Sequence, residues 1–128
     1  MLKKGFKELL AEANAAVESI SAAEARQLLE AGGAVFVDVR EGSEHAEGHI
    51  PSSVSVPRGF LEFIADPTAP MHNPALSSGK RLVLYCASGG RSALAAKTLA
   101  DMGIANVCHM AGGFGAWVQA GGPVNRRA

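Results

Sequence analysis

Cysteine and surplus charge are both scarce in this sequence, and each shortage narrows the possible functions. The two cysteines are too few for the disulfide framework of a small secreted domain. Twelve basic and twelve acidic residues cancel, which argues against binding to nucleic acid or to a membrane surface. No apolar run approaches the roughly 20 residues of a membrane-spanning helix, and the charged segment 1–17 lacks the apolar stretch of a signal peptide. We therefore expect a cytoplasmic protein whose cysteines stay reduced.

Short apolar stretches alternate with helical patterns along the 128 residues, a length that suits one domain. This alternation predicts an α/β fold, with a mostly parallel sheet of about five strands and helices on both of its faces. The predicted strands are 17–20, 34–39, 54–56, 82–85 and 106–110. The predicted helices are 2–15, 21–31, 60–65, 92–102 and a last one that contains Trp117, with one or two helical turns over 43–48.

Chemically reactive or charged residues stand at the carboxyl ends of two predicted buried strands. Cys86 comes directly after the strand 82–85, and Asp38 and Arg40 stand at the end of the strand 34–39. In a parallel sheet the ligand lies beyond the carboxyl ends of the strands. These side chains are therefore candidates for a functional site.

The segment LVLYCASGGRS, residues 82–92, has the composition of an anion-binding loop. Gly89 and Gly90 allow the backbone to curl so that successive N–H groups surround an anion. The helix predicted to begin near Ser92 points its N-terminus at the loop, and Arg91 adds a positive charge. Because helix N-termini and cations lower the pKa of a thiol, Cys86 is a candidate nucleophile.

Three interpretations of Cys86 follow from its surroundings. It could be a buried cysteine that merely ends a strand. It could be the nucleophile of a phosphatase, whose loop needs five residues between cysteine and arginine. It could also carry a persulfide, because a smaller ring favours a smaller anionic group. Only four residues intervene here, all small or flexible: Ala87, Ser88, Gly89 and Gly90.

Four motifs together resemble the rhodanese sulfurtransferase family. They are Phe36-Val-Asp-Val-Arg-Glu41, Glu44 with Gly48-His-Ile-Pro51, Cys86-Ala-Ser-Gly-Gly-Arg-Ser92, and Ala111-Gly-Gly-Phe114 with Trp117 and Gly122-Pro-Val124. The resemblance implies a three-layer rhodanese-like domain over 17–124. It leaves an amphipathic helical extension over 1–16 and a tail over 125–128, where Arg126 and Arg127 are expected to be solvated.

The resemblance also implies a two-step reaction through a persulfide. The Cys86 thiolate would take the outer sulfur of a small donor such as thiosulfate, and a thiophilic acceptor, cyanide or a thiol, would then remove it. Residues 87–92 would bind the anionic sulfur, and the acceptor could also be a protein. Histidine and cysteine are not spaced as metal ligands, so we expect no metal and no cofactor.

Other residues are predicted to support this loop. Asp38 is expected to be a structural hydrogen-bonding group, and Arg40 to pair with Glu41, Glu44 or the loop. His49 is expected to be structural, although a cysteine–histidine dyad is the alternative.

Arg58 follows a short strand, and it could either contact the donor or be a solvated loop arginine. The segment 60–79 is a plausible pocket wall. Cys108 is expected to be a buried apolar residue, with a resolving thiol as the alternative.

Two rival functions remain at this point. The domain could be a non-catalytic module that carries sulfur, senses it or docks a partner. It could also be a phosphatase or an arsenate reductase, against which the four-residue spacing between Cys86 and Arg91 argues.

Overall fold

The computed structural model describes residues 1–127 and contains one five-stranded sheet in the order β1-β5-β4-β2-β3. Every neighbouring pair of strands is parallel. The predicted α/β fold is therefore confirmed, and the sheet expected to be mostly parallel is parallel throughout. The strands are β1 (Glu18–Ile20), β2 (Ala34–Asp38), β3 (Val54–Ser55), β4 (Arg81–Tyr85) and β5 (Val107–Met110).

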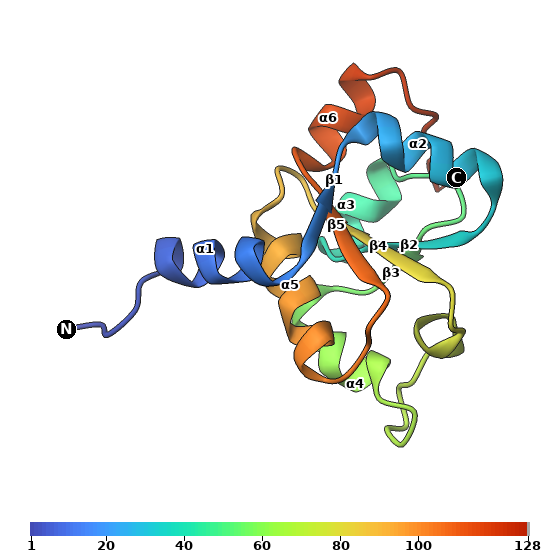
Figure 1. Cartoon of the computed structure of the whole chain (residues 1–128). Coiled ribbons are helices and arrows are strands. Elements are labelled where there is room, and N and C mark those ends of the chain that lie inside the picture. The colour runs from blue at the N-terminus through green and yellow to red at the C-terminus, as the bar shows by residue number, and fades with distance from the viewer. Residues whose placement is uncertain (128) are drawn as a thin grey trace.

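Helices cover both faces of the sheet, and two apolar clusters fill the space beneath them (Figure 1). One cluster packs α4 and α5 against the sheet, and the other packs α2 and α6 against the opposite face. The helices are α1 (Phe6–Ala16), α2 (Ala22–Ala31), α3 (Gly42–Glu47), α4 (Leu61–Ala65), α5 (Gly90–Asp101) and α6 (Gly113–Gln119). Two 3₁₀ turns, η1 (Arg58–Phe60) and η2 (Pro74–Ser77), flank α4 along the chain.

Local sequence signals explain where α2 begins and ends. The Ser21 side chain accepts a hydrogen bond from the Glu24 amide, and the Glu24 side chain accepts one from the Ser21 amide. This capping box satisfies two N–H groups that the helix itself leaves unpaired. Gly32 ends the helix in the left-handed conformation.

The N-terminal helix is shorter than predicted. It begins at Phe6 because Gly5 is extended and serves as its N-cap. Ala13 is its one buried residue in the structure, and Phe6 and Leu9 are exposed. The helix projects from the sheet layers and packs along α5 (Figure 1).

The segment after Val124 makes backbone contacts with the domain, while Arg126 and Arg127 are exposed, as expected for a solvated tail. Asn125 and His49 form an antiparallel bridge with two backbone hydrogen bonds of 2.9 Å. The Arg127 amide donates to the Ala46 carbonyl. The predicted tail also includes Ala128, which lies outside the described residues.

Over the described chain, we find no helix that is both long and apolar enough to span a membrane.

Candidate active site

Cys86 lies where β4 ends, and its thiol is enclosed by the loop that follows. The residue is 1% exposed. The Gly89 amide donates to Sγ at 3.1 Å and the Ser92 amide donates at 3.4 Å. Gly89 has φ of +113°, a conformation that glycine adopts without strain and that turns its amide toward the sulfur. Ser92 is the third residue of α5, so its amide is one of the N–H groups that the helix leaves unpaired, and it points at the thiol.

Opposing effects act on the pKa of the Cys86 thiol, and the net result is a lowered pKa. Burial raises the pKa because it disfavours the thiolate. Hydrogen bonds from the Ser92 side chain and from the amides of Ser92, Gly89 and Ser88 outweigh burial. The loop therefore favours a sulfur anion at this position.

The N-terminus of α6 fixes the orientation of the loop peptides. The Phe114 amide donates to the Cys86 carbonyl at 2.7 Å, and the Gly115 amide donates to the Ala87 carbonyl at 3.2 Å. Gly113 permits this approach, because a Cβ built on it would lie 2.5 Å from the Cys86 carbonyl oxygen. Because these two carbonyls point toward α6, the N–H groups of the same peptides point in the opposite direction, toward the side of the loop that holds the sulfur.

Arg91 is paired with a residue that comes from α3. Its Nη1 lies 2.9 Å from Glu44 Oε1, and its Nη2 lies 3.2 Å from Glu44 Oε2. This two-point contact lowers the pKa of Glu44 and raises that of Arg91. The sequence predicted a positive charge at the loop from Arg91. In the structure the Glu44 carboxylate, which was not assigned to the loop, neutralises that charge.

Asp38 organises a buried polar cluster at the end of β2. Its Oδ1 accepts hydrogen bonds from Arg40 N and Nε, and its Oδ2 accepts from Arg40 Nη2 at 2.7 Å. The His45 ring donates to the same Oδ2 through Nδ1 at 3.0 Å, and Arg40 also donates to the Gly48 carbonyl. Arg40 was predicted to pair with Glu41, Glu44 or the loop. That prediction was wrong, because Arg40 pairs with the buried carboxylate of Asp38.

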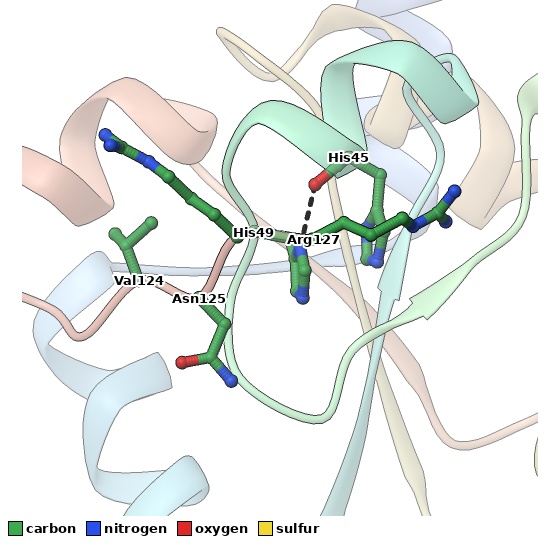
Figure 2. A pocket seen from close by; sticks show the side chains of 6 residues that line it. His45, His49, Val124, Asn125 and Arg127 are labelled. Carbon is green, nitrogen blue, oxygen red and sulfur yellow. Dashed lines mark hydrogen bonds between the residues drawn. The ribbon is translucent and has the colours of Figure 1, made fainter.

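His49 lies in the loop after α3, where its ring stacks on that of His45. The ring centroids are 3.8 Å apart, and His49 Nδ1 donates to the His45 carbonyl at 2.7 Å. Figure 2 shows this bond beside a cavity of about 670 Å³, which is also lined by Val124, Asn125, Arg126 and Arg127. The bonds to the Cys86 thiol come from Gly89 and Ser92 and not from His49, so the geometry does not favour the dyad.

Arg58 lies beside the middle of α5. Its guanidinium donates to Glu62 Oε1 and to Thr98 Oγ1, both at 3.1 Å. Thr98 lies six residues beyond Ser92 on the helix, a distance of about 9 Å along its axis. The structure thus does not bring Arg58 together with the Cys86 loop through these bonds, and its contact with a substrate stays a prediction.

His109 is a buried residue of the site that sequence analysis missed. It lies in β5, is 3% exposed, and its Nδ1 is 3.3 Å from Ser92 Oγ. Burial lowers its pKa. Strand alternation gives residue 109 the face opposite to that of Cys108 and Met110, but only the order of the strands in the sheet puts that face beneath α5.

A family model for the rhodanese-like domain matches residues 21–120. The chain belongs to the rhodanese-like domain family. The match extends from the start of α2 to the end of α6 and includes the whole Cys86 loop.

Named sulfurtransferases are among the relatives of this rhodanese. It is 40% identical over 93 residues to thiosulfate:glutathione sulfurtransferase of Saccharomyces cerevisiae, a match that covers 69% of the chain and 67% of the relative. The human single-domain sulfurtransferase has 30% identity and a TM-score of 0.68, over 80% of this chain and 96% of the human one. The chain spans 67% and 50% of two curated relatives that it matches. These likenesses support a sulfurtransferase at the general level.

A solved structure from Rhodopseudomonas palustris resembles this rhodanese over nearly its whole length. The TM-score is 0.92 and the identity 46%, over 98% of this chain and 97% of that one. That protein is described as one of unknown function and a possible tyrosine phosphatase. The likeness extends through the N-terminal helix, which the family model does not cover.

Both cysteines of the rhodanese are free thiols, but their surroundings differ. Burial raises the pKa of Cys108, whereas the loop lowers that of Cys86. Within residues 1–127, no group of three or more histidine, cysteine or acidic side chains is arranged to hold a metal ion.

Proposed function

We propose that this rhodanese transfers a sulfane sulfur from a small donor to a thiophilic acceptor through a persulfide on Cys86. The observation that carries the proposal is the convergence of loop amides on Cys86 Sγ. A persulfide ends in a sulfur anion, and amides aimed at developing negative charge stabilise it as it forms. The peptide orientation imposed by α6 keeps them in place before the donor arrives.

In the first step, the Cys86 thiolate attacks the outer sulfur of the donor. With thiosulfate, a new sulfur–sulfur bond forms at Cys86 while the original one breaks, and sulfite leaves with the electron pair. In the second step, cyanide or a thiolate attacks the terminal sulfur of the persulfide. Thiocyanate or a new persulfide leaves, and Cys86 returns to the thiolate.

The donor and acceptor are proposed as chemical classes. Ala87 and Ser88 are neutral and exposed, and Arg91 is paired with Glu44, so little free positive charge surrounds the loop. A less highly charged persulfide could therefore replace thiosulfate as donor. A thiol acceptor is supported by the relative named for glutathione, and a protein thiol would satisfy the same chemistry. No nucleic acid, membrane, metal or cofactor has a part in this cycle.

The proposed location is the cytoplasm. Its reducing conditions suit the two free cysteines, and they supply thiols as acceptors.

Phosphate-ester hydrolysis is the second candidate, because the Rhodopseudomonas palustris protein is described as a possible tyrosine phosphatase. Two observations count against it in this chain. Four residues separate Cys86 from Arg91, and the planar fork of Arg91 that would bind a phosphate is engaged by Glu44.

The experiment that tests these alternatives is a comparison of substrates with one preparation. We expect thiosulfate or an organic persulfide, with cyanide or glutathione as acceptor, to sustain turnover that Cys86→Ser abolishes and Cys108→Ser preserves. Hydrolysis of an aryl phosphate without sulfur transfer would replace the proposal with a phosphatase. Absence of both reactions, with a Cys86 pKa at the free value of about 8.5, would favour a binding module.

A further inference from the structure

A continuous row of hydrogen-bonding groups leads from the Cys86 thiol to the N-terminal helix. Cys86 Sγ lies 3.5 Å from Ser92 Oγ, and Ser92 Oγ lies 3.3 Å from His109 Nδ1. On the far side of the ring, His109 Nε2 lies 3.1 Å from Asn14 Oδ1 and 2.9 Å from Ser19 Oγ. Ser92 and His109 are buried, whereas Asn14 and Ser19 are exposed, so the row ends at the surface between α1 and β1.

The acceptor at the outer end fixes the direction of these bonds. Asn14 Oδ1 has no hydrogen to donate, so the tautomer that satisfies this contact has the proton on His109 Nε2, which donates it. In a neutral imidazole Nδ1 is then unprotonated and accepts from the Ser92 hydroxyl. The hydroxyl oxygen in turn accepts from the Cys86 thiol. The Gly89 carbonyl, 3.2 Å from Ser92 Oγ, is the other acceptor available to this hydroxyl.

We propose that His109 receives the proton of the Cys86 thiol through Ser92 and that Asn14 of α1 holds His109 in the tautomer that does so. The Cys86 S–H bond breaks, and its proton bonds to Ser92 Oγ. The Ser92 O–H bond breaks at the same time, and that proton bonds to His109 Nδ1. The products are a thiolate and an imidazolium, joined by a Ser92 hydroxyl that now donates to the sulfur.

His109 is thus a positioning residue that acts on the reacting sulfur through Ser92. The groups that the structure places on its ring nitrogens come from α1, β1 and α5, and all are uncharged. Burial among them keeps the imidazole neutral while the thiol is protonated. The thiolate formed two hydrogen bonds away supplies the negative charge that offsets the burial of the imidazolium. The role of this proton transfer in catalysis rests on the proposed function, whereas the row of hydrogen bonds is observed independently of it.

The test measures the pKa of Cys86 from the pH dependence of iodoacetamide alkylation in a Cys108→Ser background. We expect His109→Asn, which can still reach Ser92 but cannot take the proton, to raise the pKa by about one unit, or tenfold in thiolate at neutral pH. Asn14→Asp should lower it, because a carboxylate stabilises the imidazolium. Ala15→Asp puts the same charge on the exposed neighbouring position of α1 and should leave the pKa unchanged.

A spectroscopic readout tests the same coupling directly. The ¹⁵N chemical shifts of the His109 ring should show a proton shared with Nδ1 while the pair still holds it, and should change to those of the neutral imidazole at the pH midpoint where the pair loses that proton to solvent. In Cys86→Ala that transition should vanish. A Cys86 pKa that responds neither to His109→Asn nor to Asn14→Asp would overturn the inference, as would a His109 ring that never takes up a proton. If His109→Asn fails to fold, the substitution at exposed Asn14 still decides the outcome.

The alkylation assay needs no sulfur transfer, which separates this inference from the proposed function. A wild-type protein that accepts no sulfur but whose thiol pKa follows these substitutions would defeat the proposed function alone. A protein that forms the persulfide but whose thiol ignores them would defeat the coupling alone.

Discussion

Ser92 is the side chain on which the chemistry of the thiol most depends. Its amide and its hydroxyl both contact Cys86 Sγ, and the hydroxyl also contacts the Gly89 carbonyl and the His109 ring. Asp38 has a comparable place in the neighbouring polar cluster, where its two oxygens accept four hydrogen bonds. A single substitution at either position therefore changes several contacts at once.

Ser92→Ala should raise the pKa of Cys86 and slow persulfide formation. The variant loses the hydroxyl that favours the thiolate but keeps the amide and the helix. We expect a rise of about one pKa unit and a roughly tenfold slower first step at neutral pH. Alkylation rates measured against pH give the thiol pKa. Ser88→Ala, which removes an exposed hydroxyl from the same loop, should change little.

Arg40→Ala should destabilise the fold strongly. The substitution leaves the Asp38 carboxylate buried with His45 and the backbone amide of residue 40 but without its guanidinium partner. Removing one partner of a buried ion pair typically costs about 3–5 kcal/mol. Lys97→Ala, which breaks an exposed pair with Asp101, should cost under about 1 kcal/mol. Urea unfolding of both variants checks the contrast, and equal losses would refute it.

At the scale of elements, the site is built where β4, α5 and α6 meet. The thiol follows β4, the N-terminus of α5 supplies amides to the sulfur, and the N-terminus of α6 binds the carbonyls of Cys86 and Ala87. Gly113 is the residue that lets α6 approach so closely. A side chain there would collide with the backbone of the loop.

Gly113→Ala should therefore disturb both stability and thiol reactivity. Its φ is +62° and its Cβ would meet Cys86 and Ala87 backbone atoms within about 2.6 Å. Gly79→Ala is the matched control, since its φ is +82° but no atom lies within 4 Å of the new Cβ. We expect Gly79→Ala to lose about 1 kcal/mol with normal alkylation of Cys86. Gly113→Ala should lose more and also alter the alkylation rate. Equal behaviour of the two variants would contradict the assigned role of α6.

The sequence predicted the strands well because buried parallel strands are continuous apolar runs with clear ends. Helix starts were less accurate. Gly5 and Gly89 decide where α1 and α5 begin, and glycine caps carry little pattern. The loop itself was predictable from its composition. Its partners Glu44 and His109 were not, because each comes from a separate element and only the sheet order brings it to the loop.

At the scale of the whole molecule, the two thiols make opposite contributions to the pH dependence of stability. The folded-state pKa of Cys86 is lowered, so unfolding takes up a proton over the range between its folded pKa and the unfolded value of about 8.5. The stabilisation from Cys86 is thus present above that unfolded value and is lost as the pH falls through the folded pKa. Cys108 has a raised pKa, so its contribution is present below about 8.5 and declines at higher pH.

The free energy of unfolding of the wild type, minus that of Cys86→Ala, should therefore grow as the pH rises and then level off above about pH 8.5. The corresponding difference for Cys108→Ala should be flat at low pH and fall above that value. Urea unfolding at several pH values measures both differences. A Cys86 difference that is independent of pH would mean that the loop does not favour the thiolate.

The central claim is that Cys86 carries the transferred sulfur, and intact-mass measurement tests it most directly. The protein is treated with thiosulfate, freed of excess donor and weighed, alongside Cys86→Ser and Cys108→Ser. The account predicts an added mass of one sulfur atom on the wild type and on Cys108→Ser, none on Cys86→Ser, and loss of the addition when cyanide is supplied. An addition that survives on Cys86→Ser, or a wild type that gains none from thiosulfate or from an organic persulfide, would contradict it.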